Sequence, residues 1–255
     1  MRHHTLFAGL FSGISVTLCL CLFYAPMFGQ EPDWKQLALQ LKSKEVAARR
    51  AAVEAIGKRS EETGVDLLVG ALEDSDQEVR SSAALTLGQI GSPKAAPALA
   101  RLLKSPQTRD RRSAAVGLGM VGGDVAREAL IVALSSTSAE DRESAVSALG
   151  NFGDAKAAEP LIRVLGDSSI AVRSGAAVAL GQLRDKRAVD PLIKALGDEE
   201  TSVRTVAALS LGELGEARAI EPLNKLLAKE KDPNVRQQIE YALKRLREAP
   251  KGKPE

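Results

Sequence analysis

Residues 171–198 read AVRSGAAVALGQLRDKRAVDPLIKALGD, and this stretch decides the fold. Its third residue, Arg173, has counterparts at a constant interval along the chain. The interval is 31 residues in five successive steps and 32 in the last, and the column consists of Arg49, Arg80, Arg111, Arg142, Arg173, Arg204 and Arg236. A period this constant is typical of a stack of one repeated structural unit rather than of a domain with a single core.

Each repeat contains two helical patterns separated by a short turn. In the first pattern, apolar residues recur at steps of four, as in Val172, Ala176 and Leu180, which places them on one helix face. A glycine follows the arginine by eight residues in six of the repeats. The second pattern carries a leucine column, and a proline precedes that column in three repeats, where the first helical turn tolerates proline. The leucine column consists of Leu68, Leu99, Leu130, Leu161, Leu192 and Leu223.

Neither helix of a repeat can bury its apolar stripe alone, so neighbouring repeats must stack to complete the core. Residues 34–41 have the pattern of a lone second helix. Residues 235–246 have the pattern of a lone first helix whose outer face is polar, as a terminal cap requires. The sequence therefore predicts an all-α fold, a right-handed α-solenoid of about six 31-residue helix-turn-helix repeats with half-repeat caps. We expect the solenoid to span residues 33–247 and a disordered tail to occupy residues 248–255.

The repeated motif resembles that of a known family. Val-Arg-x-x-Ala-Ala-x-x-Leu-Gly-x-[Leu/Ile]-Gly, followed by Ala-x-x-Pro-Leu-[Ile]-x-x-Leu-x-Asp, is similar to the short bacterial HEAT repeat, often called the phycobilisome-lyase-like HEAT repeat. A second instance is SVRTVAALSLGELGEARAIEPLNKLL at residues 202–227. The resemblance covers residues 33 to 247 and implies a HEAT-type stack. It implies little about function, because the motif residues are those that make the stack.

Residues 1–29 do not follow the repeat. A single charge, Arg2, precedes a long apolar run over residues 6–25, which is typical of an export signal. The run is close to the length of about 20 residues that spans a bilayer, so an uncleaved membrane anchor is the alternative to a cleaved signal peptide. We therefore expect an exported protein, periplasmic or secreted, or else one anchored in the cytoplasmic membrane, with membrane contact only through this segment.

Composition argues against several classes of function. Without Arg2 the chain keeps 34 of its 35 basic residues against 33 acidic ones, and this balance argues against nucleic-acid binding. Both cysteines, Cys19 and Cys21, and both histidines, His3 and His4, lie in the leader. The remaining chain lacks the residues for a Ser-His-Asp triad, a disulfide or a thiolate metal site, so we expect no catalytic residues, no cofactor and no metal.

Two groups of proteins with similar repeats have chemistry of their own. Chromophore lyases of light-harvesting antennae carry this kind of repeat, and a bilin needs an apolar, aromatic-lined groove. Only Trp34, Phe152 and Tyr241 are aromatic after the leader, so lyase-like activity is an alternative rather than our expectation. Deoxyhypusine hydroxylase is also a HEAT-type stack and holds a di-iron centre with His-Glu pairs. This sequence has no His-Glu pair, so that activity does not carry over.

The arginine column has two interpretations. Aligned guanidinium groups can clamp the carboxylates or phosphates of a partner. In the structural interpretation, which we favour, an aspartate six residues before the arginine caps the first helix and pairs with an arginine of its own or the next repeat. The aspartates at this position are Asp74, Asp167 and Asp198.

Repeats three and four depart from the pattern. Asp110 and Asp141 replace the valine that precedes the arginine, and the structural interpretation makes them N-caps of helices that begin one residue later. Repeat three also carries additional glycines and a basic loop. From these features we hypothesise a hinge flanked by a partner-binding patch. The residues of the patch are Arg101, Lys104, Arg109, Arg111 and Arg112.

Stacked repeats generally present extended concave surfaces to partners. We expect a non-enzymatic scaffold or adaptor, exported to the cell envelope, that binds a protein or peptide on a concave face formed mainly by the second helices. A chromophore-lyase-like enzyme, or an enzyme accessory subunit, is the alternative.

Overall fold

The computed structural model describes residues 33–248, and over this range the chain forms α-helices and short 3-10 helices with no strand. The predicted all-α solenoid is confirmed. The first helices of the repeats are α3 (Val46–Arg59), α5 (Gln77–Ile90), α7 (Thr108–Val121), α9 (Ala139–Phe152), α11 (Ile170–Leu183), α13 (Thr201–Leu214) and α15 (Pro233–Glu248). The second helices are α2 (Trp34–Gln40), α4 (Val65–Ala71), α6 (Ala96–Leu102), α8 (Gly123–Ala133), α10 (Ala158–Arg163), α12 (Val189–Ala195) and α14 (Ile220–Lys229).

Short 3-10 helices lie beside most of the second helices. They are η1 (Glu62–Gly64), η2 (Pro93–Ala95), η3 (Ala155–Ala157), η4 (Val164–Gly166), η5 (Lys186–Ala188) and η6 (Ala217–Ala219). The predicted leader at residues 1–29 lies outside the described residues, as does the tail from residue 249 onward. Glu248, which the sequence analysis assigns to the tail, is the last residue of α15. No helix within residues 33–248 has the length and apolar character needed to cross a membrane.

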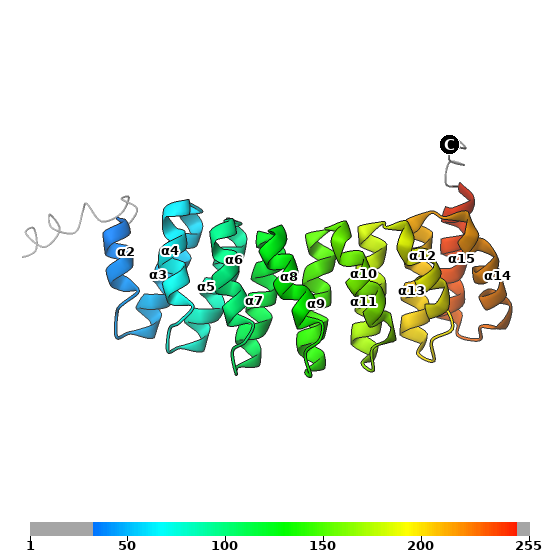
Figure 1. Ribbon diagram of the computed structural model, residues 1–255, viewed down its shortest axis with the longest axis horizontal. Coiled ribbons are helices and arrows are strands. Elements are labelled where there is room, and N and C mark those ends of the chain that lie inside the picture. The colour runs from blue at the N-terminus through cyan, green and yellow to red at the C-terminus, as the bar shows by residue number, and fades with distance from the viewer. Residues whose placement is uncertain (1–32, 249–255) are drawn as a thin grey trace, which may run out of the picture.

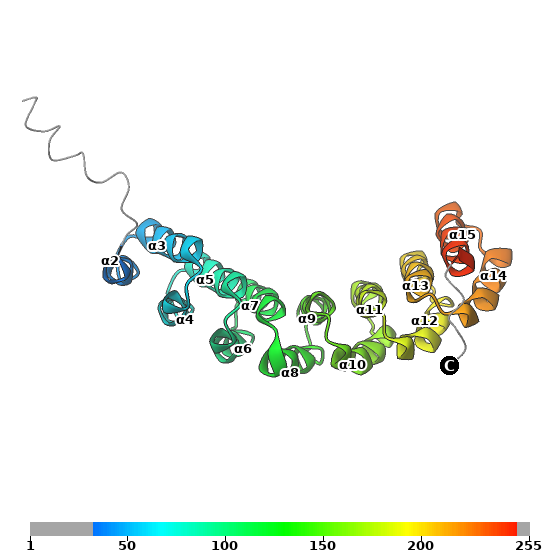
Figure 2. The ribbon, with the colours of Figure 1, turned by 90° about the horizontal axis from the view of Figure 1, so that it is seen from above.

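The helices follow one another in chain order along a single elongated stack (Figure 1). Figure 2 shows that the odd-numbered first helices, α3 to α15, lie along the concave side of the arc, and that the even-numbered second helices, α2 to α14, lie along the convex side. The prediction that the second helices form most of the concave face is therefore wrong.

The direction of the curve follows from the side chains at the contacts between repeats. The first helices meet through glycine and alanine. A Cβ added to Gly88 would lie 2.8 Å from the Cα of Gly117, and one added to Gly119 would lie 3.0 Å from the carbonyl oxygen of Ala148. The second helices instead carry the leucine column, which is buried throughout. Because small residues bring helices closer together than leucine does, the stack bends toward the first helices.

The apolar columns predicted from the sequence form one continuous core. The residue before each column glycine is fully buried on the first helix, as is the leucine of the second helix. Full burial of one such side chain stabilises the folded state by about 1.5–3 kcal/mol, so each repeat contributes a similar increment. The first-helix members are Ile56, Leu87, Leu118, Leu149, Leu180 and Leu211.

The two ends of the stack close differently. At the N-terminal end, α2 buries Leu37, and the guanidinium carbon of Arg59 lies 4.3 Å from the ring centroid of Trp34. At the other end, α15 buries Ile239 and Leu243 and presents polar residues on its outer side. A polar outer face allows the stack to end in solvent.

Repeat three turns between its helices without a 3-10 helix. The first helix α7 ends before Gly122, whose φ of 70° lies in the left-handed region, and α8 begins at the next residue. A Cβ added to Gly122 would also lie 2.5 Å from the ring of Phe152 on α9. Glycine meets both requirements, so this position serves the close contact between repeats three and four.

Candidate functional site

The arginine column lies near the start of each first helix, and its side chains reach the next repeat. Arg49 donates from Nε to Asp74 Oδ2 at 2.7 Å and from Nη2 to Asp74 Oδ1 at 2.9 Å, so the pair is bidentate. We call this row of contacts the arginine ladder. Equivalent contacts follow in later repeats: Arg142 with Asp167, Arg173 with Asp198, and Arg204 with Glu230.

Each ladder arginine also binds the backbone that leads into its own helix. Arg204 donates from Nη1 to the carbonyl oxygens of Asp198, at 3.0 Å, and of Glu199, at 2.9 Å. The same two carbonyl positions accept from every arginine between Arg49 and Arg204. One guanidinium group therefore fixes the loop of its own repeat and holds the acid of the next.

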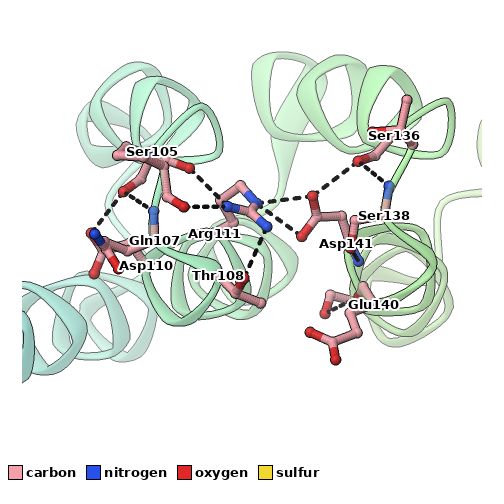
Figure 3. A network of polar contacts seen from close by, with 12 residues as sticks. Ser105, Gln107, Thr108, Asp110, Arg111, Ser136, Ser138, Glu140 and Asp141 are labelled. Atoms are coloured by element: carbon pink, nitrogen blue, oxygen red, sulfur yellow. Dashed lines mark hydrogen bonds and ion pairs between the residues drawn. The ribbon is translucent and has the colours of Figure 1, made fainter.

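Asp110 and Asp141 supply the ladder acid in repeats three and four (Figure 3). Arg80 donates from Nε to Asp110 Oδ2 at 2.8 Å, and Arg111 donates from Nε to both carboxylate oxygens of Asp141 at 2.9 Å. The interpretation of these two aspartates as N-caps is wrong. Their helices begin earlier, at Thr108 and Ala139, so each aspartate lies within the first helical turn.

Serine occupies the loop position from which the ladder acid is missing. Ser105 stands 31 residues after Asp74; its hydroxyl donates to Asp110 Oδ2 at 2.8 Å and accepts from the amide of Gln107 at 3.2 Å. Ser136 makes the equivalent pair of contacts with Asp141 and the amide of Ser138. In the other repeats the loop aspartate both holds the arginine and accepts from a loop amide, so serine and the helix aspartate divide these two roles.

The ladder neutralises its charges within the chain. The hydrogen bond from Arg142 lowers the pKa of Asp167 from its ordinary value, and Arg173 does the same for Asp198, while burial opposes both shifts. Arg204 likewise lowers the pKa of Glu230. Guanidinium groups held in this way are occupied by internal acids, which favours the structural interpretation of the column over the clamp. Two details of that interpretation are wrong. The N-cap positions of the helices are Asp76, Ser169 and Glu200 rather than the loop aspartates two residues earlier, and each loop aspartate pairs with the arginine of the preceding repeat.

The residues predicted to form a partner-binding patch do not lie together. Arg101 and Lys104 line a hollow beside α4 and α6, among the second helices. Arg109 is paired with Glu78, and Arg111 belongs to the ladder. Only Arg112 of this set lines a hollow among the first helices, on the concave side.

That concave side carries a groove which the sequence analysis did not identify. Three neighbouring hollows follow it: one between α3 and α5, one of about 770 Å³ across α5, α7 and α9, and one across α9, α11 and α13. Every residue that lines them belongs to a first helix. The largest hollow has a volume typical of ligand sites.

Exposed apolar side chains follow the same groove. Most stand five residues after the ladder arginine, so they recur at the repeat interval. They are Leu85, Val116, Val178 and Tyr241, and Met120 lies one turn beyond Val116. A periodic column at this offset is visible in the sequence, but only the curvature shows that it faces the concave side.

The second helices carry exposed apolar side chains as well, but those on α8 stand among charged neighbours. Val125 and Val132 lie exposed on α8. Asp124, which precedes Val125, forms an ion pair with Arg127 at 2.6 Å. In residues 33–248 no cluster of three or more histidine, cysteine, aspartate or glutamate side chains is arranged to hold a metal ion.

The two-layered stack of helix pairs defines an α-solenoid repeat protein. The family model for HEAT repeats matches residues 34–119, 126–194 and 159–244, which together make up most of the chain, and the chain belongs to the HEAT-repeat family. This confirms the resemblance stated for the repeated motif. No curated protein matches this sequence.

Solved structures with this fold include protein complexes. A chain from the complex of CpcE and CpcF of phycocyanin lyase from Nostoc sp. PCC7120 is 25% identical, with a TM-score of 0.52 over 88% of this chain and 98% of that one. Kap95p, solved with RanGDP, is 16% identical, with a TM-score of 0.58 over 83% of this chain and 35% of Kap95p. An engineered protein is 24% identical, with a TM-score of 0.51 over 72% of this chain and 96% of that one. The last two likenesses concern the fold alone.

Proposed function

We propose that this protein is a non-enzymatic interaction scaffold that binds a protein or peptide on its concave face. The observation that carries the proposal is the row of exposed apolar side chains along the groove of the first helices, from Leu85 to Tyr241. Apolar side chains that recur on one face and line a continuous groove are typical of a surface that a partner covers.

The ladder supports the proposal because the residues that hold the stack together are not those that line the groove. The ladder arginines stand at the beginning of the first helices and are held by internal acids. The groove residues follow them on the same helices and make no part of the ladder. A scaffold can therefore vary its groove from repeat to repeat while the same contacts hold the stack together.

We further propose that the protein acts outside the cytoplasm. The support is the leader, in which Arg2 precedes the apolar run of residues 6–25. Cell fractionation and N-terminal sequencing test this part. A start near Gln30 means cleavage of the leader, an intact Met1 in the membrane fraction means an anchor, and full-length protein in the cytosol contradicts both.

A lyase accessory role is the second candidate, favoured by the 25% identity to a chain of the CpcE–CpcF complex. Against it, the three aromatic side chains within residues 33–248 are scattered. Trp34 packs against Arg59 at one end of the stack, Phe152 lies against Gly122, and Tyr241 is exposed on α15 at the other end. A shift in the absorbance of a bilin on mixing with the protein would favour this candidate.

Site-specific photo-crosslinking in the native cells tests the concave face. A crosslinking amino acid at Leu85 or Val178 should form an adduct with one defined partner, because both side chains point into the groove. The matched control is Val132, which is more exposed, at 72%, but lies on α8 in the convex layer. Adducts from Val132 and none from the groove positions would refute concave-face binding.

A further inference from the structure

The largest of the three hollows lies around α7 and α9. Small residues line it at Gly119, Ser147 and Ala148, and the exposed apolar side chains of Val116 and Met120 stand beside them. Its volume of about 770 Å³ exceeds the 480 Å³ and 340 Å³ of the hollows on either side.

Ser147 lines this hollow and also the one across α9, α11 and α13. It stands five residues after the ladder arginine, where α5, α7, α11 and α13 carry leucine or valine. The counterparts are Leu85, Val116, Val178 and Leu209. Because serine is smaller than leucine or valine, Ser147 leaves more free space at this point of the groove.

Two unpaired charges of opposite sign also line the hollow. Arg112 on α7 and Glu143 on α9 are exposed, and within residues 33–248 neither side chain takes part in an ion pair or a side-chain hydrogen bond. On the same two helices, Arg111, one residue before Arg112, is paired with Asp141, two residues before Glu143. Opposite charges on neighbouring first helices therefore pair elsewhere in the stack, whereas these two remain open to a partner.

We infer that this hollow binds an extended peptide segment in which one bulky apolar residue lies between an acidic and a basic residue three positions apart. The apolar side chain fills the space that Ser147 leaves beside Val116 and Met120. The carboxylate of the segment pairs with Arg112, and its cation pairs with Glu143. The inference rests on the proposed function, because it names the occupant of the same concave face.

The spacing of the two charges sets the spacing in the peptide. Packed helices generally lie about 8–10 Å apart, and α7 and α9 are neighbours in one layer. In an extended segment, residues three positions apart are separated by about 9–10 Å. An acidic and a basic residue at positions i and i+3 therefore reach Arg112 and Glu143 together, with the apolar residue between them.

Two labelled peptides test the inference with the full chain. Their sequences are Gly-Ser-Glu-Leu-Ser-Arg-Ser-Gly and the reverse order, Gly-Ser-Arg-Ser-Leu-Glu-Ser-Gly, because an extended segment can run in either direction. Fluorescence anisotropy should show that one order binds at least about tenfold more tightly than the same peptide with serine in place of leucine. Binding of neither peptide below about 1 mM overturns the inference.

The variant Ser147→Leu tests whether the apolar side chain enters the hollow. Leucine is native at Leu85 and Leu209 in the same column, so the fold should tolerate it, and an unchanged melting temperature checks this. We expect binding to weaken by about tenfold or more. The matched control, Val178→Leu, enlarges a side chain in the same column on α11 and should leave binding unchanged. Equal effects of the two variants contradict the inference.

The variant Arg112→Glu tests the charges through a change of preference. With two acids at the hollow, the protein should prefer the peptide in which arginine replaces glutamate, by about two- to fivefold over the original peptide. A variant that weakens both peptides equally contradicts the charge assignment. If crosslinking at Val178 captures a partner while Ser147→Leu and Arg112→Glu have no effect, the inference fails and the proposed function stands.

Discussion

Asp110 accepts a hydrogen bond of 2.8 Å from Arg80 of the preceding repeat, although it occupies a helix position that four of its counterparts fill with valine. The loop position that carries the ladder acid elsewhere holds Ser105, which donates to the same carboxylate oxygen. The acid has thus changed position along the chain while keeping its arginine. The ladder depends on the presence of a carboxylate at the joint rather than on one fixed sequence position.

The carboxylate can therefore be moved from position 110 to position 105 by two substitutions. We expect Asp110→Val alone to lower the free energy of unfolding by about 1–3 kcal/mol, because Arg80 loses its acid. Adding Ser105→Asp should restore most of that loss, since the pair then matches Asp74 and Val79 of the preceding repeat. Chemical denaturation of the three proteins checks this. A double variant no more stable than Asp110→Val would show that the loop cannot supply the acid here.

The burial of Asp110 bears on the expected stability of the double variant. Asp110 is 1% exposed, and among the described residues its Oδ1 and the hydroxyl of Ser81 are buried without a hydrogen-bond partner. Unsatisfied buried polar atoms cost about 1–3 kcal/mol each. The double variant removes one of them, Asp110 Oδ1, which favours recovery of the stability that Asp110→Val alone loses.

Removal of a ladder arginine separates the structural interpretation from the clamp. We expect Arg173→Ala to lower the free energy of unfolding by about 1–3 kcal/mol, between the values for an exposed and a broken buried pair. Its side chain is 10% exposed and holds Asp198 and two carbonyl oxygens. Arg112→Ala, the control, should leave the thermal midpoint unchanged. An Arg173→Ala protein that kept its stability and lost its partner would support the clamp instead.

The ladder also predicts how stability depends on pH. Arg142 and Arg173 lower the pKa of Asp167 and Asp198 in the folded chain below the ordinary value of 3.8. The unfolded chain therefore takes up these protons at a higher pH than the folded chain. Their contribution to stability is complete above about pH 4 and is lost as the pH falls through the folded pKa values.

Thermal unfolding between neutral and strongly acidic pH measures this effect. We expect the melting temperature to fall steeply below about pH 4, and to fall less steeply in the Arg142→Ala variant, whose Asp167 has lost the guanidinium group that lowers its pKa. Parallel curves for the two proteins would place the acid sensitivity outside the ladder.

Two glycines in helices should respond in opposite ways to alanine. In an open helix position alanine is favoured over glycine by about 1 kcal/mol, and a Cβ on Gly70 of α4 would meet nothing within 4 Å. Gly70→Ala should therefore stabilise the chain. A Cβ on Gly117 of α7 would lie 2.7 Å from the carbonyl oxygen of Ala84, so Gly117→Ala should destabilise it by about 1–3 kcal/mol. Stabilisation by both changes would mean that α5 and α7 can move apart freely.

The sequence alone was sufficient for the repeat, the helices and the core. The columns through Leu87 and Leu99 have the same environment in every repeat, so periodicity predicts them directly. The side that becomes concave depends on the difference in thickness between the glycine layer and the leucine layer, which no single repeat contains. The recurrence of the groove column that contains Leu85 is visible in the sequence. Its position on the concave side follows only from the curvature.

The role of Asp110 could not be predicted from the sequence, for a different reason. Three of the six ladder pairs lie 25 residues apart, as Arg49 and Asp74 do, whereas Arg80 and Asp110 lie 30 apart. An aspartate near a helix start is most simply interpreted as a cap. The pairing becomes visible only when the preceding helix is packed beside it, because the arginine that selects the acid comes from another repeat.

At the joint between repeats three and four, two effects on α7 oppose each other. Its glycines favour a flexible backbone, whereas its close packing against the neighbouring helices restrains it. If the glycines dominate, the joint is a hinge, and amides of residues 114–121 exchange hydrogen faster than those of residues 176–183 in the free protein. Addition of the leucine-containing peptide should then slow exchange in residues 114–121, because Val116 and Met120 line the hollow. Equal protection of both segments in the free protein would show that the contact of Gly119 with Ala148 holds the joint as firmly as any other, and the hinge hypothesis would fall.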